Sequence, residues 1–348
     1  MSDYLVGSAS PLLDVHDLLV LDLDGVVYVG PDAVPGAVHA LEAAVRSGTA
    51  LRYATNNAAR PPEVVAEHLR TLGLPATADE VVTASQAAAA VVADRLGAGA
   101  RVLAVGGPGV AEALSEVGLV PVTSADDEPA AVVQGYGPDV GWRQLTEAAL
   151  AVRAGALWVA TNLDATLPTP RGQAPGNGSL VAAVRTATGA EPLVAGKPEP
   201  GLFRLAARGA GSPLAVGDRL DTDIAAARNA GMPSLLVLTG VSGPEQLLGA
   251  VPAERPDAVA ADLSGLSRAH PAPSPDGDAW VCGSAVARVR DGRLVLESPG
   301  DAGPDRDGLD GLRAAAAAGW QASDAGTSWT LEPSTAAALV RPDVLPRR

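Results

Sequence analysis

Two aspartates separated by one residue, Asp22 and Asp24, follow an apolar run near the N-terminus. The run, residues 18–21, is short, which favours a buried strand, and Gly25 after the pair permits a turn. Because an unpaired buried carboxylate is costly, acids at a buried strand end indicate a compensating positive charge. Such a pair suits a divalent metal, a carboxylate nucleophile or an acid–base couple, while a surface Asp-x-Asp-Gly turn stays open as an alternative.

Polar side chains that could bind a phosphate or a metal follow three further segments. A hydroxyl and backbone N–H groups between a strand and a helix can hold a phosphate. A lysine on a Gly/Pro loop supplies a positive charge, and acids after a strand can bind a metal. Each signal is weak alone, since such threonines and loops are usually structural. In chain order the segments are Thr55-Asn56-Asn57 after residues 50–54, Lys197 within residues 195–200, and Asp218 and Asp223 after residues 214–217.

In this order the four segments resemble those of the haloacid dehalogenase-like hydrolases, specifically the NagD-type phosphatases, over residues 18–263. The resemblance implies an α/β fold with three parts. A Rossmann-like core with a parallel sheet would comprise residues 1–96 and 192–263. An inserted α/β cap domain would comprise residues 97–191, and a small α+β domain would occupy residues 264–348.

The resemblance also implies a role for each motif residue. Asp22 would be the nucleophile that forms an aspartyl-phosphate, and Asp24 the general acid and base. The residues implied to bind the phosphate are Thr55, Asn56, Asn57 and Lys197. The ligands implied for Mg²⁺ are Asp22, Asp24 (through its carbonyl), Asp218 and Asp223.

Two segments of the expected cap resemble the family's cap loops, residues 161–164 and 175–179. From the first we expect Asn162 and Asp164 to contact the substrate. The second opens a predicted helix, so capping of that helix by Asn177 or Ser179 is an open alternative to a role in specificity.

Composition restricts the partners. The 348 residues include 40 acidic and 25 basic side chains, a net charge of −15, which argues against a nucleic-acid partner. A small phosphate monoester would also be repelled at long range, so its binding must come from close contacts. We find no signal sequence and no apolar run of membrane length, and we expect a cytoplasmic protein without a membrane span.

The scattered histidines and the one cysteine carry no expected chemistry. Cys282 excludes an intrachain disulfide and is expected to be a small buried hydrophobe. The four histidines lack metal-ligand spacing and are expected on surfaces. Their positions are His16, His39, His68 and His270.

Strand and helix patterns alternate through the first two parts of the chain, which favours parallel sheets. The expected helices are residues 35–47, 61–72 and 85–96. The expected strands of the insert are residues 101–105, 131–134 and 157–161.

The tail beyond residue 264 lies outside the usual NagD-type pattern. Residues 271–277 are typical of a linker, and residues 285–290 and 293–297 alternate around Asp291-Gly292, which predicts a hairpin. A helix is expected over residues 308–318, and three tryptophans could form a small core. They are Trp280, Trp320 and Trp329.

With this tail, the whole chain resembles actinobacterial glycerol 3-phosphate phosphatases, whose extension is related to part of an acetyltransferase (GNAT) fold. The tail is short and lacks a coenzyme A pyrophosphate loop, so we expect it to be structural or regulatory rather than an acetyltransferase. We expect its removal to spare the catalytic residues.

The expected function is therefore Mg²⁺-dependent hydrolysis of a small phosphate monoester, with glycerol 3-phosphate the first choice. Phosphoglycolate, a nucleotide or broad activity on p-nitrophenyl phosphate remain alternatives. A protein that holds a phosphoaspartate as a signal is the alternative of another class. Cap-mediated homodimers are common in the family, and a homodimer stays open here.

Overall fold

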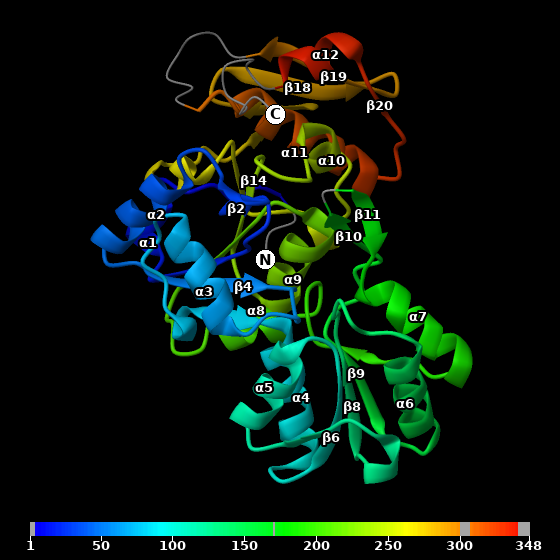
Figure 1. The fold of residues 1–348 in the computed structure, drawn as a ribbon. Helices are drawn as coiled ribbons and strands as arrows, with labels where there is room; N and C mark the ends of the chain where they lie inside the picture. The colour runs from blue at the N-terminus through cyan, green and yellow to red at the C-terminus, as the bar shows by residue number, and fades with distance from the viewer. Residues whose placement is uncertain (1–3, 170, 300–306, 340–348) are drawn as a thin grey trace. The chain divides into compact units, whose positions relative to one another are not determined.

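The computed structural model describes residues 4–169, 171–299 and 307–339 (Figure 1). The chain divides into two compact units, residues 1–52 with 209–348, and residues 53–208. The boundary near residue 52 falls inside strand β4 (Ala50–Thr55), which is part of a six-stranded sheet with the order β15-β14-β13-β1-β4-β5.

The first unit is built on parallel strands with fully apolar stretches. Residues 18–21 form a strand with the predicted bounds, and all four side chains are buried. Strands buried on both faces require such continuous apolar runs. The parallel strands are β1 (Leu18–Leu21), β13 (Pro213–Gly217), β14 (Ser234–Val237) and β15 (Ala258–Ala260).

Short helices and one small hairpin connect these strands. The hairpin pairs β2 (Tyr28–Val29) with β3 (Asp32–Ala33). The helices are α1 (Leu12–Val15), α2 (Ala37–Arg46), α9 (Ala225–Ala230) and α10 (Pro244–Leu248). Helix α2 lies inside the predicted range of residues 35–47.

In its described residues, the tail adds a five-stranded sheet and two helices to the first unit. The predicted hairpin is confirmed: Asp291 and Gly292 both have positive φ, 51° and 70°, as a tight hairpin turn requires. The strands are β16 (Ser274–Asp276), β17 (Ala279–Cys282), β18 (Ala285–Arg290), β19 (Arg293–Pro299) and β20 (Thr330–Leu331). The helices are α11 (Asp310–Asp324) and α12 (Pro333–Ala338).

Two expectations about the tail were wrong. Residues 271–277 are not wholly a linker, because residues 274–276 form β16 and pair with β17. The tail also has no separate tryptophan core. Trp280 and Trp320 belong to one hydrophobic cluster that includes side chains of β14, β15 and α10, with Trp329 packed against it. The tail and the parallel sheet of the first unit therefore share a core.

The second unit contains a five-stranded parallel sheet with the order β12-β9-β8-β6-β7. The predicted strands 101–105 and 131–134 are confirmed, and strand 157–161 is confirmed to within one residue. The strands are β6 (Arg101–Val105), β7 (Val120–Val122), β8 (Ala131–Gln134), β9 (Leu157–Ala160) and β12 (Leu193–Val194).

Helices pack around this sheet, and α6 and α7 share a hydrophobic cluster with its strands. The helices of this unit are α3 (Pro62–Thr71), α4 (Ala84–Leu96), α5 (Pro108–Glu116), α6 (Trp142–Arg153), α7 (Asn177–Thr188) and α8 (Gly201–Ala206). Strand β5 (Val81–Thr83) pairs with β4, and β10 (Thr166–Thr169) pairs with β11 (Gly172–Pro175).

Cys282 is buried, as expected, but the surface expectation for the histidines fails at His270, which is only 2% exposed. Its main chain bridges to Ser8 and its Nε2 lies 2.9 Å from the Gly265 carbonyl. None of the helices in the described part of the chain combines the length and the apolar character that crossing a bilayer requires.

Candidate active site

Asp22 occupies the carboxyl end of β1. Its N–H donates to the Val216 carbonyl at 2.9 Å and so continues the pairing with β13. The chain then turns tightly, and the Leu23 carbonyl accepts the N–H groups of residues 26–28 at 2.9 to 3.3 Å. The Asp22 side chain is only 8% exposed, whereas Asp24 lies on the exposed side of the turn.

Asp218 follows the neighbouring strand β13 and is 1% exposed. Its Oδ2 accepts the Val241 N–H at 2.7 Å, and its carbonyl accepts the Ser242 N–H at 3.0 Å. Gly25 and Gly240 lie so close to this carboxylate that a Cβ at either position would collide with it. Gly25 also has φ +83°, so the turn after Asp22 needs glycine for two reasons.

Asp223 lies in a π-helical turn, residues Leu220–Ile224, that precedes α9. Such turns are frequent at functional sites. The Arg219 N–H donates to Asp223 Oδ2 at 3.1 Å, and a Cβ at Gly217 would collide with the Asp223 side chain. The residues just before the turn therefore hold this carboxylate in place.

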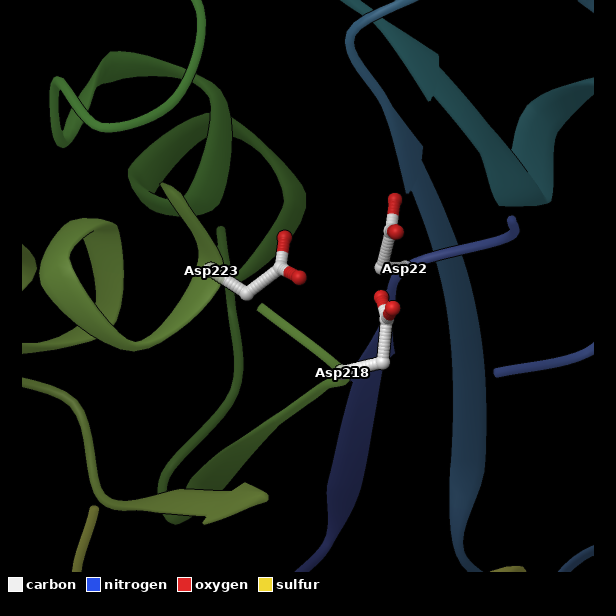
Figure 2. Close-up of side chains that lie close together, drawn as sticks. All are labelled: Asp22, Asp218 and Asp223. Atoms are coloured by element: carbon white, nitrogen blue, oxygen red, sulfur yellow. The ribbon is translucent and has the colours of Figure 1, made fainter. Parts of the chain in front are cut away.

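The three carboxylates converge. One oxygen from each of Asp22, Asp218 and Asp223 lies within 4.8 Å of the other two, and all three side chains are buried (Figure 2). Like charges at this spacing repel, and burial raises the cost of each charge. A divalent cation with oxygen ligands removes both penalties, and Mg²⁺ prefers such ligands. The donor set therefore fits Mg²⁺.

A second group of predicted site residues meets in the other unit, around Lys197. The Asn56 side chain holds the Lys197 main chain at two points: Oδ1 accepts its N–H at 2.9 Å, and Nδ2 donates to its carbonyl at 3.2 Å. The Lys197 ammonium donates to the Ala54 carbonyl at 3.3 Å and lies 5.7 Å from the Phe203 ring centroid. This lysine, 3% exposed, is held at both its backbone and its charged end.

Thr55 and Asn57 form the loop after β4. Thr55 Oγ1 accepts the Asn57 N–H at 3.1 Å, and Asn57 Oδ1 accepts the Ala59 N–H at 2.9 Å. The loop lies between β4 and α3, as expected, and six residues separate Thr55 from the first residue of α3. The Thr55 side chain is 3% exposed.

Buried amides extend this network away from Lys197. Asn162 Nδ2 donates to the Asn56 carbonyl at 2.8 Å, and Asn177 Nδ2 donates to the carbonyls of Asn162 at 2.8 Å and Gln134 at 3.2 Å. Trp158 Nε1 donates to Gln134 Oε1 at 3.1 Å. The hydrogen bonds thus run from the interior of the five-stranded sheet to the loop that holds Lys197.

Asp164 also belongs to this network, because its Oδ2 lies 3.5 Å from Asn56 Nδ2 and its N–H donates to Asn162 Oδ1 at 3.1 Å. The capping alternative for the second cap segment is wrong. Gly176 is the N-cap of α7 and no side chain caps it, while Asn177 is buried in the amide network and Ser179 Oγ donates to the Ala165 carbonyl.

Sequence reasoning missed several residues of both groups. Val241 and Ser242, which contact Asp218, lie in residues 239–243, and Gln134 ends β8. A Thr-Gly-Val-Ser-Gly segment directly after the apolar run 235–238 was the available signal for Val241 and Ser242.

Comparison with known families now identifies the class. Residues 19–120 match the haloacid dehalogenase-like hydrolases, residues 194–266 match a related hydrolase-like family, and residues 282–341 match a GCN5-related N-acetyltransferase like domain. The chain belongs to the haloacid dehalogenase-like hydrolases. Within them it is a NagD-type phosphatase with a GNAT-like C-terminal domain.

Individual relatives agree with this assignment. The chain is 49% identical over 313 residues, 88% of its length and 86% of the relative, to D-glycerol 3-phosphate phosphatase of Mycobacterium tuberculosis. It is 39% identical over 227 residues, 64% of its length and 86% of the relative, to acid sugar phosphatase of Staphylococcus aureus.

Solved structures show the same fold. The structure of glycerol phosphate phosphatase from Mycobacterium tuberculosis in complex with magnesium has a TM-score of 0.85 at 44% identity and covers 95% of this chain and 98% of that one. A 4-nitrophenylphosphatase from Thermotoga maritima has a TM-score of 0.66 at 31% identity, and the match covers 74% of this chain and 98% of that one. The expected α/β fold is confirmed.

Proposed function

We propose that this phosphatase uses Mg²⁺ to hydrolyse glycerol 3-phosphate, through an aspartyl-phosphate formed on Asp22. The observation that supports it most directly is the convergence of three buried carboxylates in a chain that is 49% identical to a D-glycerol 3-phosphate phosphatase over 88% of its length. The magnesium complex of a structural relative supports the choice of metal.

The proposed ligands are the carboxylates of Asp22, Asp218 and Asp223, with the Asp24 carbonyl as a fourth protein ligand. Bound Mg²⁺ would offset the negative charge of the phosphoryl group as it is transferred. The carboxylate of Asp24 is outside the convergent group, which agrees with a separate role for it.

Two aspartates would carry the covalent chemistry. Asp22 attacks phosphorus in line, the bond from phosphorus to the glycerol oxygen breaks, and Asp24 protonates the departing alkoxide. Asp24 then takes a proton from the water that attacks the aspartyl-phosphate, which releases inorganic phosphate and restores Asp22.

The residues of the second unit would bind the phosphate. Lys197 supplies a positive charge, and Thr55 and Asn57 supply a hydroxyl and backbone N–H groups. Because the Asn56 amide is committed to the Lys197 main chain, we assign Asn56 a positioning role through that lysine. Asn162 and Asp164 remain proposed substrate contacts, and both also belong to the amide network.

A broader substrate range is the second candidate, supported by the similarity to an acid sugar phosphatase and a 4-nitrophenylphosphatase. We keep three further proposals from the sequence: the division into core, cap and extension at residues 97, 192 and 264, a cytoplasmic location, and a homodimer.

The proposal is tested by phosphate release from a panel of monoesters, with and without Mg²⁺: glycerol 3-phosphate, phosphoglycolate, a nucleoside monophosphate and p-nitrophenyl phosphate. We expect metal-dependent release with the highest kcat/KM on glycerol 3-phosphate. A higher kcat/KM on another ester would refute glycerol 3-phosphate as the preferred substrate and leave the proposed mechanism standing. No release, with a phosphate that stays on the protein, would favour the signalling alternative.

A further inference from the structure

The C-terminal extension contains a helix whose first eleven residues are all buried. Residues 310–320 of α11 are consecutively buried, although the segment includes the charged residues Asp310 and Arg313 beside five alanines. A surface helix would show only one apolar stripe. Helix α11 contacts β17, β18 and β19 of the extension and also contacts α10 (Figure 1). The extension is therefore packed into the first unit rather than attached to its surface.

Trp320 joins α11 directly to α10. Its side chain is 0% exposed, and its Nε1 donates to the Leu247 carbonyl at 2.9 Å. Leu247 and Leu248, the last two residues of α10, are buried in the same hydrophobic cluster as Trp320. Because α10 has only five residues, its own hydrogen bonds cannot hold it, and packing must do so.

A second contact holds the chain just after α10. The buried Arg255 donates through Nε to the Ala250 carbonyl at 3.2 Å, and its guanidinium lies 5.0 Å from the Trp320 ring centroid. Its two terminal nitrogens donate to the carboxylate of Asp324, at the end of α11, at 2.8 and 2.7 Å. Two residues near the end of α11 thus reach the segment 247–250. Trp320 contacts it directly, and Asp324 contacts it through Arg255.

Helix α10 begins where the loop that holds Asp218 ends. Within residues 239–243, the N–H of Val241 donates to Asp218 Oδ2 and the N–H of Ser242 donates to its carbonyl. The Ser242 hydroxyl accepts the Leu220 N–H at 3.1 Å, at the start of the turn that contains Asp223. The position of this loop therefore affects two of the three convergent carboxylates.

The same cluster reaches the Asp223 turn from its apolar side. Leu220 and Ile224, at the two ends of that turn, are 5% and 0% exposed and belong to the cluster that contains Trp320. The extension consequently packs against the turn that contains Asp223 and against α10, which follows the loop that holds Asp218.

We infer that the C-terminal extension positions the Mg²⁺ site, with Trp320 and Asp324 acting through α10 on the loop that holds Asp218. The inference rests on the proposed metal ligands and assigns the extension a role in the phosphatase reaction itself. It replaces our expectation that removal of the tail would spare the catalytic residues. Trp320 and Asp324 are positioning residues, because neither touches the metal or the substrate.

The test measures binding of Mg²⁺ alone, by calorimetry, to the full-length chain and to Trp320→Phe. This change removes one hydrogen bond to Leu247 and keeps a ring in the core. Loss of one such bond predicts Mg²⁺ binding about two- to tenfold weaker. The Mg²⁺ concentration for half-maximal activity should rise equally, while kcat at saturating Mg²⁺ changes less than threefold.

Trp329→Phe is the matched control. The indole of Trp329 donates only within the extension in the described part of the chain, to the Gly319 carbonyl and to Ser323 Oγ, both at 3.0 Å. It should lower the melting temperature without changing Mg²⁺ affinity by more than twofold. Equal Mg²⁺ affinity in wild type and Trp320→Phe, or equal weakening in both tryptophan variants, would overturn the inference.

Asp324→Asn gives a second variant if Trp320→Phe fails to fold, because Asp324 is partly exposed and only its contact with Arg255 is lost. Its control is Asp278→Asn, whose partner Arg288 lies on the extension's own sheet. Asp324→Asn should weaken Mg²⁺ binding and Asp278→Asn should not. If the wild-type chain bound no Mg²⁺ at all, the proposed function itself would fail.

Discussion

The carboxamide of Asn56 holds Lys197 by its main chain, accepting the lysine N–H and donating to the lysine carbonyl. The two residues are 141 positions apart in the sequence. A long, flexible side chain needs such a fixed origin if its ammonium is to meet a phosphate in one place, because each free torsion costs entropy when the charge is localised. In the proposed phosphate site, Asn56 would thus position Lys197 without contributing its own amide.

Replacing Asn56 by alanine should therefore impair phosphate binding more than folding. Two hydrogen bonds to the Lys197 main chain are lost, each worth about 0.5–1.5 kcal/mol. We expect kcat/KM to fall about 5- to 100-fold, chiefly through KM, in steady-state assays.

Asn56→Asp is the informative partner, because it keeps the acceptor for the Lys197 N–H and loses the donor to its carbonyl. Its added charge would also face Asp164, so its loss should be at least as large as that of the alanine variant. Unchanged KM in both variants, with normal melting temperatures, would refute the positioning role.

Asp22→Asn should abolish turnover and leave the fold intact, because an amide cannot form the acyl phosphate that the proposed mechanism requires. Asp14→Asn, an exposed aspartate on α1, is a suitable control and should be as active as wild type. Phosphate release and circular dichroism check the two halves of this prediction. Appreciable turnover by Asp22→Asn would exclude it as the nucleophile.

Asp218→Asn should remove most Mg²⁺ binding and should stabilise the metal-free chain. Neutralising one of three converging buried carboxylates relieves repulsion, since like charges at this distance disfavour each other. We expect a higher melting temperature than wild type in EDTA and a much smaller increase when Mg²⁺ is added. A lower melting temperature in EDTA would contradict the repulsion argument.

His270 should make the free energy of unfolding depend on pH below about 6.5. Burial is the main cause that lowers the pKa of His270, with the nearby charge of Arg313 acting the same way and Asp307 opposing it. The unfolded chain then binds the proton more readily, so stability is complete above the ordinary pKa of 6.5 and falls as the pH drops below it. Urea unfolding between pH 5.5 and 7.5 should show this slope, and His270→Gln should reduce it.

Cys282 should be unreactive in the native protein. It is 1% exposed, and burial together with the negative charge of Asp310 raises the pKa of its thiol to about 12. A thiol-specific reagent should label it in urea and fail to label it in buffer at pH 8. Rapid labelling of the native chain would show that the extension opens locally.

The ends of the parallel strands could be predicted because the signal is local. At residues 18–22 an apolar run changes abruptly to an acid, and the structure places that change at the end of β1. Residues 239–243 could not be assigned, because they act on Asp218 largely through backbone N–H groups, and any residue except proline has one. Asn56 posed a related problem, since an amide that binds a backbone looks the same in sequence as one that binds a ligand.

The burial of α11 could not be predicted from the sequence either. Its run of alanines shows little contrast between faces, so periodicity indicated a helix without indicating that every face is covered. The predicted range 308–318 stopped before Trp320 and Asp324, the two residues that connect the helix to α10 and Arg255. We consequently expected the tail to have a core of its own.

The late position of α11 in the chain bears on the order of events during biosynthesis. Residues 310–320 leave the ribosome only after β14, β15 and α10, the elements whose core they enter. The two acids of the Asp218–Asp223 segment are translated long before the helix that packs behind them. Nascent or prematurely terminated chains that lack α11 would therefore leave this core uncovered and accessible to chaperones and proteases.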